Sequence, residues 1–314
     1  MDSVKRRIRY KLSNKRDDFI AWKKNGKKRY VIDNRFGIID EDYLSVACII
    51  KNEGRYIREF IEFHKLAGVD RFFIFDNGST DNTKDVLKKY IESGEIVYIY
   101  FPGEKMQFPA YRYAIKLCKR TTRWLAFLDA DEFLFSPHSS LKESLKEFED
   151  EVAVGVNWVC FGPSGHEKRP SGLVIKNYTE TFEDKDNFFN RHIKSVVHPW
   201  LVESINSPHF CRYKCGRLAV DENHIFIDGS ATNTPYKSYA FTDKNNTNKL
   251  RINHYITKSV EDLVEKSRRG YPDGMPSNKT QESLERFNVP LRNDKTIERF
   301  IKELEQRLSD NQGL

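Results

Sequence analysis

The segment "RWLAFLDADEFLF" (residues 123–135) joins a strand-like apolar run to a cluster of acidic side chains. Its first part is rich in aliphatic and aromatic residues, which is typical of a buried strand. The run then meets Asp129, Asp131 and Glu132. Carboxylates this close repel one another and lose hydration, so a partner must compensate their charge. The nature of that partner is the main question that the sequence raises.

Strand-like and helix-like segments alternate on both sides of this run. The apolar stretches that predict buried strands are residues 43–50, 71–75, 95–101, 123–129 and 152–159. Most of the segments between them carry apolar residues at helical spacing. Strands separated by helices of about 10–15 residues predict βαβ units and a mostly parallel sheet flanked by helices. The predicted fold class is therefore α/β.

The chain divides into three predicted parts. Residues 1–40 form a basic N-terminal arm, residues 41–270 form one α/β domain, and residues 271–314 hold a connector and a final helix. The final helix is predicted at residues 295–309, because apolar residues run along one side of it. We expect that side to pack on the domain, which makes the C-terminal segment a helical addition to the fold.

Polar side chains follow the first two predicted strands. Lys51, Asn52 and Glu53 come directly after the first strand, and Asp76 and Asn77 follow the second. Ligands of open α/β sheets bind beyond the carboxyl ends of the strands. We therefore expect these residues to lie on one edge of the sheet together with the acidic cluster.

Asp129 and Asp131 are two residues apart. In an extended segment such residues point to the same side, so both carboxylates can face one site. Carboxylate oxygens bind Mg²⁺ and Mn²⁺, particularly where phosphate oxygens complete the coordination. A divalent cation is thus a candidate for the missing partner, and a solvated strand end or helix cap is the alternative reading of so short a motif.

Longer blocks of sequence resemble a known family. "CIIKNEGRYIREFIEFHKLAGVDRFFIFDNGSTDNT", "WLAFLDADEF" and "NHYITKSVEDLVEKSRRG" resemble the glycosyltransferases of family 92 and related family-2-like bacterial enzymes with the GT-A fold. The blocks "NWVCFGPSGH" and "RHIKSVVHP" also match. The likeness covers roughly residues 43–270, and it implies a GT-A-type fold for the main domain.

This resemblance implies a metal site. Asp129 and Asp131 are similar to the D-x-D pair that meets Mn²⁺ (or Mg²⁺) and the diphosphate of a nucleotide-sugar. His254 is similar to the late histidine that often completes the metal shell in GT-A enzymes. Glu132 is expected to orient its neighbours by hydrogen bonding.

The resemblance also implies a site for the nucleotide-sugar donor, with UDP as the expected carrier. Asp76 is similar to the acidic residue that touches the nucleoside, and Lys258, Lys266 and Arg269 are candidates for positioning phosphates. The residues expected to bind the donor are Lys51, Asn52, Glu53, Asp76, Asn77, Asp129, Lys194 and Lys258.

The expected reaction is transfer of the sugar to a hydroxyl group of a glycan or a lipid-linked sugar, with inversion at the anomeric carbon. Such a reaction needs a group that takes the proton of the acceptor hydroxyl. The first candidates for this catalytic base are Glu203, Asp221 and Glu222, and the secondary candidates are His166 and His198.

Two other functions fit parts of the pattern. A sugar-phosphate nucleotidyltransferase also uses paired aspartates, but it usually needs a glycine-rich loop after the first strand, where this chain has only Gly54. A sugar-binding protein without activity is the second alternative, and the acidic pair together with His254 argues against it.

The N-terminal arm carries most of the positive charge. Residues 1–29 hold twelve Lys and Arg against three Asp and Glu, whereas the whole chain has a net charge of only +7. The arm predicts contact with an anionic membrane surface or a phosphate-bearing acceptor, unless it is simply solvated; no motif indicates nucleic acid. Five cysteines without a C-x-x-C pair indicate a reducing compartment, so we expect a cytoplasmic protein, peripheral at the inner face of the membrane.

Overall fold

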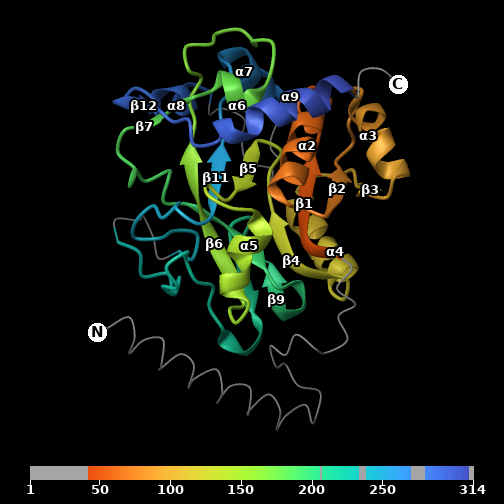
Figure 1. Ribbon diagram of the computed structural model, residues 1–314, viewed down its shortest axis with the longest axis vertical. Helices are drawn as coiled ribbons and strands as arrows, with labels where there is room; N and C mark the ends of the chain where they lie inside the picture. The colour runs from red at the N-terminus through yellow and green to blue at the C-terminus, as the bar shows by residue number, and fades with distance from the viewer. Residues whose placement is uncertain (1–41, 206, 233–237, 270–279, 311–314) are drawn as a thin grey trace.

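The computed structural model describes residues 42–205, 207–232, 238–269 and 280–310 of the 314-residue chain (Figure 1). The predicted basic arm and the predicted connector lie outside these residues. Across the described ranges, the structure contains no helix with the length and apolar character that a membrane crossing would require.

An eight-stranded sheet forms the centre of the fold. Its order is β3-β2-β1-β4-β8-β6-β11-β5. The first four strands in this order run parallel to one another, and β11 is parallel to β6. The predicted α/β fold with a mostly parallel sheet is therefore confirmed. The strands are β1 (Asp42–Ile50), β2 (Arg71–Asp76), β3 (Ile96–Tyr100), β4 (Thr122–Phe127), β5 (Glu132–Phe135), β6 (Ala153–Cys160), β8 (Ile193–Val197) and β11 (Arg251–His254).

Two strands depart from the regular βαβ pattern. Strand β8 lies between β4 and β6 and is antiparallel to both. Strand β5 reverses direction after the acidic cluster and pairs antiparallel with β11 at the edge of the sheet. Residues 128–131 therefore connect β4 to β5 along the edge at which β1 and β4 end. This connection holds the acidic side chains at the rim of the sheet.

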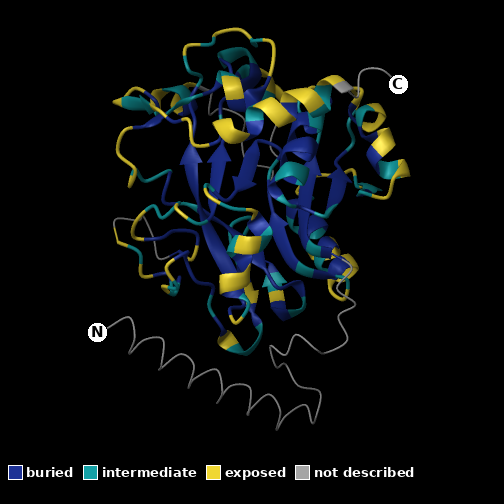
Figure 2. Ribbon diagram, viewed as in Figure 1, coloured by how far each residue is buried: buried dark blue, intermediate teal, exposed yellow. Residues whose placement is uncertain are grey.

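Helices cover the sheet, and the remaining short elements surround it (Figure 1). Exposed residues lie mainly on helices and loops, whereas the strands are buried (Figure 2). The helices are α2 (Ile57–Ala67), α3 (Thr83–Glu92), α4 (Gln107–Cys118), α5 (Leu141–Leu145), α6 (Val174–Asn177), α7 (Val260–Arg269), α8 (Thr280–Glu285) and α9 (Ile301–Asp310). The short strand pairs are β7 (Glu180–Phe182) with β12 (Leu291–Asn293), and β9 (Val202–Ile205) with β10 (Cys211–Tyr213).

The C-terminal helix packs on the domain as the sequence indicates. Phe300, just before α9, lies 4.9 Å from Phe63 of α2, measured between ring centroids. The guanidinium of Arg58 donates a hydrogen bond of 2.7 Å to the Leu308 carbonyl. The apolar side of α9 therefore closes over α2 and extends the core.

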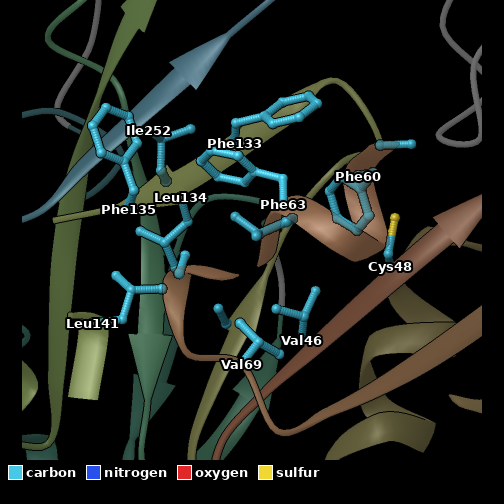
Figure 3. Close-up of a cluster of buried hydrophobic side chains, with 14 of the residues drawn as sticks. Val46, Cys48, Phe60, Phe63, Val69, Phe133, Leu134, Phe135, Leu141 and Ile252 are labelled. Atoms are coloured by element: carbon cyan, nitrogen blue, oxygen red, sulfur yellow. The ribbon is translucent and has the colours of Figure 1, made fainter. Parts of the chain in front are cut away.

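An aromatic cluster fixes the position of β5 (Figure 3). Phe133 packs against Phe60 and Phe63 of α2, at centroid distances of 6.0 and 5.0 Å. His64 accepts a 3.0 Å hydrogen bond from the Leu134 amide through Nε2, while its Nδ1 donates to the Phe60 carbonyl. These contacts attach the edge strand to α2, and with it the adjoining acidic turn.

A buried glutamate joins α2 to the loop that carries α6. The Glu59 carboxyl group accepts hydrogen bonds of 2.8 and 3.1 Å from the amides of Val174 and Ile175. Burial raises its pKa to about 7, against the opposing effect of these two hydrogen bonds and of Lys258. The folded protein thus binds this proton more tightly than the unfolded chain does. The resulting stability is fully present below the unfolded pKa of about 4.3 and is lost as the pH rises toward 7.

The substitution Glu59→Gln is expected to remove this pH dependence, because glutamine does not titrate. Between pH 5 and 7 the difference in unfolding free energy between wild type and variant should change by up to ~1.4 kcal/mol per pH unit. Urea unfolding at several pH values measures it. Glu92→Gln, at an exposed position of α3, serves as the control; parallel pH profiles for wild type and Glu59→Gln would contradict the prediction.

Candidate functional site

A cleft of about 730 Å³ lies at the edge of the sheet where β1, β4 and β6 end. One wall is formed by residues that follow β1, β2 and β3, and the centre by the acidic turn. The opposite wall comes from β6, β8 and α8. The lining residues used below are Lys51, Glu53, Asn77, Glu104, Gln107, Asp129, Asp131, Trp158, Phe188, Phe189, His192, Lys194, His209, His254, Lys266 and Arg286.

Asp129 is bound to a buried lysine. Nζ of Lys194, whose side chain is 1% exposed, donates to Oδ2 of Asp129 at 2.8 Å. Gln107 and Tyr111 of α4 donate to the other carboxylate oxygen at 3.2 and 3.4 Å. Burial alone would raise the pKa of Asp129, but the Lys194 ammonium lowers it below the ordinary value. Asp129 is therefore an anion held in place by three donors.

Glu132 lies beneath the turn and is fully buried. Its Oε2 accepts a 3.0 Å hydrogen bond from the Asp129 amide and lies 3.4 Å from Nζ of Lys194. Burial raises the pKa of Glu132 well above its ordinary value, although Lys194 acts in the opposite direction. The expected role of Glu132 in orienting its neighbours agrees with its bond to the Asp129 backbone.

Asp131 faces a different pair of groups. Nζ of Lys266, on α7, donates to Oδ2 of Asp131 at 2.6 Å, and Nε2 of His254 lies 3.6 Å from Oδ1. Burial would raise the pKa of Asp131, but Lys266 and His254 lower it well below the ordinary range. Two lysines, Lys194 and Lys266, therefore compensate the charge of the acidic cluster in the protein itself.

The residues around Asp131 fit a divalent cation that also binds phosphate. Oδ1 of Asp131 and Nε2 of His254 face each other at 3.6 Å, and a carboxylate oxygen and an imidazole nitrogen are both ligand types that would hold a divalent cation. In the described part of the chain, no three or more His, Cys, Asp or Glu side chains form a metal-binding group. Mg²⁺ commonly needs only one or two protein carboxylates where phosphates supply further ligands.

Two unpaired buried atoms support the histidine as a ligand. Nδ1 of His254 and Oε1 of Glu132 are both buried without a hydrogen-bond partner. The two residues are directly opposite in the β5–β11 ladder, so their side chains lie on the same face of the sheet. A carboxylate near the second ring nitrogen is the usual means of orienting a metal-binding histidine.

The structure distributes the predicted donor-binding residues over three places. Lys51, Glu53, Asn77, Asp129 and Lys194 line the cleft. Asn52 and Lys258 line a smaller neighbouring pocket, to which Glu53 also contributes. Asp76 lines neither pocket.

Hydrogen bonds account for the positions of Asp76 and Asn52. Asp76 accepts from the Tyr98 hydroxyl at 2.6 Å and from the Ser79 amide at 2.7 Å. Asn52 accepts from the Thr80 amide at 2.7 Å, with its own backbone in the left-handed region at φ 54°. Both residues thus fix the turn after β2. The side chain of Arg269 lies outside the described residues.

The structure does not bring the three predicted carboxylate bases to the cleft. Glu203 is exposed on β9, and Val220, just before Asp221, pairs with Val154 near the start of β6, whereas the cleft lies at the end of that strand. Glu222 accepts hydrogen bonds from three consecutive amides, those of residues 248–250. Asp221 accepts from the amides of residues 223 and 225. Both carboxylates of this pair are occupied in shaping loops.

The two histidines that were secondary candidates for the base also have structural roles. His198 stacks on Trp124 at a centroid distance of 3.8 Å and bonds to the Arg123 carbonyl. His166 bonds to the Asn177 carbonyl at 3.2 Å. Neither residue lines the cleft.

The aromatic wall opposite the residues that follow β1, β2 and β3 was not predicted from the sequence. Trp158 is stacked on His192 at 5.1 Å and contacts His209 and His254 at 5.1 and 4.3 Å between ring centroids. Phe188 and Phe189 extend this wall. The residues come from β6, β11 and two loops, so no local spacing reveals that they meet.

One family of known proteins matches most of the chain. Residues 45–268 match the family described as glycosyltransferase family 92. The chain belongs to glycosyltransferase family 92. This confirms the resemblance seen in the sequence, and together with the mixed sheet it gives the protein a GT-A-type fold.

Relatives with the same family name occur in plants. A family 92 protein of Oryza sativa subsp. japonica is 32% identical over 185 residues, which cover 57% of this chain and 31% of the rice protein. A family 92 protein of Arabidopsis thaliana is 26% identical over 248 residues, which cover 74% of this chain and 41% of that protein. The chain thus spans less than half the length of these curated relatives.

Solved structures are more distant. The structure of S. aureus TarS residues 1–349 has 13% sequence identity and a TM-score of 0.38, covering 77% of this chain and 69% of that one. Glucosyl-3-phosphoglycerate synthase from Mycobacterium tuberculosis, in complex with Mn²⁺, UDP-glucose and phosphoglyceric acid, has 19% identity and a TM-score of 0.26. It covers 43% of this chain and 47% of that one.

Proposed function

We propose that this family 92 protein transfers a sugar from a UDP-sugar to a hydroxyl group of a glycan or a lipid-linked sugar, with Mn²⁺ or Mg²⁺ as cofactor. The observation that carries the proposal is the arrangement of the cleft. One continuous cavity runs from a polar wall, past the paired aspartates and two lysines, to an aromatic wall. A donor nucleotide, a diphosphate and an acceptor sugar need these three surfaces in this order.

The nucleoside end suits a base with an N–H donor. Oδ1 of Asn77 is buried in the wall of the cleft without a hydrogen-bond partner. The imide N–H of uracil can donate a hydrogen bond to an amide oxygen, whereas neutral cytosine has no hydrogen on the equivalent ring nitrogen. This unpaired acceptor favours UDP over CDP.

The centre of the cleft suits a diphosphate. Asp131 and His254 would hold the metal ion, which when bound supplies positive charge to the departing diphosphate. Lys51 and Lys266 add ammonium groups to the lining, and charge that develops on phosphate oxygens is stabilised by such preplaced cations. Asp129, fixed by Lys194, shapes the turn on which Asp131 is presented.

The aromatic wall suits a sugar acceptor. Sugar rings bury their C–H faces against aromatic side chains, and Trp158 with Phe188 and Phe189 offers apolar surface of this kind. Arg286 lies over Phe189 at 4.6 Å and adds a charged donor for acceptor hydroxyl or phosphate groups. An acceptor on this wall would face a donor sugar held beside Asp131, as direct displacement with inversion requires.

The proposal is tested by nucleotide binding to the purified protein. UDP with Mn²⁺ at 100 times its dissociation constant is expected to raise the unfolding free energy by ~2.7 kcal/mol, seen as a higher Tm. CDP, GDP and ADP with Mn²⁺, and UDP with EDTA, should give smaller shifts. Release of UDP from a panel of UDP-sugars then identifies the donor.

A strict requirement for a nucleoside triphosphate plus a sugar phosphate would instead identify a nucleotidyltransferase. Equal Tm values with and without every nucleotide would contradict the proposed function altogether.

A further inference from the structure

His192 lies at the point where the acidic centre of the cleft meets the aromatic wall. Strand β8 is antiparallel to β4 and β6, so the residue before β8 reaches the edge at which those two strands end. The Trp158 amide donates to the His192 carbonyl at 2.9 Å, and both side chains line the cleft. On β8, Lys194 is only two residues away and holds Asp129.

The hydrogen bonds of His192 define which ring nitrogen carries the proton. Nδ1 lies 3.2 Å from the carbonyl oxygen of Phe189. Because a carbonyl oxygen can only accept, Nδ1 must be the donor, and Nε2 of the neutral ring therefore carries a lone pair. The side chain is partly exposed at the cleft.

Packing fixes the orientation of this ring. Trp158 stacks on it with an angle of 18° between the rings, and Phe241 lies 4.1 Å away between centroids. Phe188 contacts it edge-on at 5.2 Å. These contacts hold the imidazole, as a proton acceptor, in one orientation.

Each carboxylate that lines the cleft either is bound to a lysine or lies at the end proposed for the nucleoside. Asp129 is bound to Lys194, and Asp131 to Lys266 beside His254. Glu53 and Glu104 follow β1 and β3, on the nucleoside side of the sheet order. The acceptor half of the cleft therefore offers imidazoles rather than carboxylates.

We propose that Nε2 of His192 is the general base that accepts the proton of the acceptor hydroxyl, an inference that rests on the proposed sugar transfer. As the acceptor oxygen forms its bond to the anomeric carbon, the bond from that carbon to the diphosphate oxygen breaks, and its electron pair leaves with UDP. The proton moves to Nε2 and gives an imidazolium, which afterwards returns the proton to water. The products are UDP and the glycosylated acceptor.

The surroundings keep the ring neutral before the reaction. Burial, together with the weaker effect of the positive charges of Arg286 and Arg191, lowers the pKa of His192 to about 4, against the hydrogen bonds to the backbone at Phe189 and Phe188. His209 faces the same ring at 5.6 Å, and burial and Lys194 lower its pKa to about 3. At neutral pH the base is thus present in its active form, and the imidazolium releases its proton readily.

The test compares His192→Gln with the wild type in release of UDP from the UDP-sugar panel with Mn²⁺, where water or an added glycan is the acceptor. Loss of a general base typically lowers turnover by about 10²- to 10⁴-fold. UDP affinity, measured by calorimetry on the same samples, should change by less than about twofold, because the nucleoside and diphosphate surfaces remain. His224→Gln, in a cluster with Glu147 and Glu151 outside the cleft, is the matched control.

Three outcomes would overturn the assignment. The first is wild-type turnover in His192→Gln, and the second is loss of turnover in His209→Gln but not in His192→Gln. The third is a long-range ¹H–¹⁵N spectrum of the full chain in which His192 carries its proton on Nε2 at pH 7. Wild-type protein that binds UDP and releases it from a UDP-sugar, combined with an active His192→Gln, would refute this base alone. Wild-type protein with no nucleotide binding would refute the proposed function.

Discussion

Asp131→Asn is expected to abolish the metal-dependent part of donor binding and to lower turnover of a UDP-sugar by about 10²- to 10³-fold, the usual cost of losing electrostatic stabilisation at a reacting centre. The carboxylate of Asp131 faces both His254 and Lys266 and is the group best placed to hold a cation beside the diphosphate. Asparagine keeps the shape of the side chain but removes its charge. Calorimetric titration of UDP with Mn²⁺ and with EDTA separates metal-dependent binding from the remainder.

Asp85→Asn, on the exposed side of α3, is the control for the loss of one carboxylate. It should bind UDP and turn over the donor as the wild type does. If Asp131→Asn retains the same affinity difference between Mn²⁺ and EDTA as the wild type, the metal does not bind at this residue. The assignment of Asp131 and His254 as its ligands would then be wrong.

The regular half of the sheet was predictable because each of its strands is an apolar run, and the runs are separated by segments with helical spacing. Strands β1 to β4 fall within one or two residues of the segments expected from the sequence. The reversal into β5 was not predicted, because "EFLF" continues an apolar segment and carries no turn signal of its own. The insertion of β8 was missed because its pairing with β4 and β6 is determined by tertiary packing, which the local sequence does not show.

The candidate site shows the same division. Asp129, Asp131 and Lys51 reach the cleft because parallel strands end at one edge, a rule that sequence order alone supplies. The base could not be found in this way, since Asp221 and Glu222 are occupied by backbone amides that only the folded loops bring to them. His192 belongs to a block already noticed for its family likeness, but its position beside Trp158 depends on the pairing of β8 with β6.

Lys194→Met is expected to lower the unfolding free energy by ~3–5 kcal/mol, because removing one partner of a buried ion pair leaves the other charge uncompensated. Lys194 is buried on β8 and contacts the carboxylates of Asp129 and Glu132. The lowered pKa of Asp129 reflects this contact. A lowered carboxylate pKa stabilises the fold above the unfolded pKa of about 3.9, and this stabilisation is lost as the pH falls through the folded pKa. Urea unfolding at pH 7 should thus show a larger difference between wild type and variant than at pH 3.

A second substitution distinguishes charge from packing in this result. Methionine fills much of the space of the lysine stem. Lys194→Met combined with Asp129→Asn should therefore recover part of the lost stability, because the second substitution removes the carboxylate charge that Lys194 no longer compensates. Lys88→Met, whose side chain is 73% exposed on α3, should change the unfolding free energy by less than ~0.5 kcal/mol. If the double variant is no more stable than Lys194→Met alone, Lys194 supports the fold by packing. The charge of the acidic turn would then be compensated by Lys266.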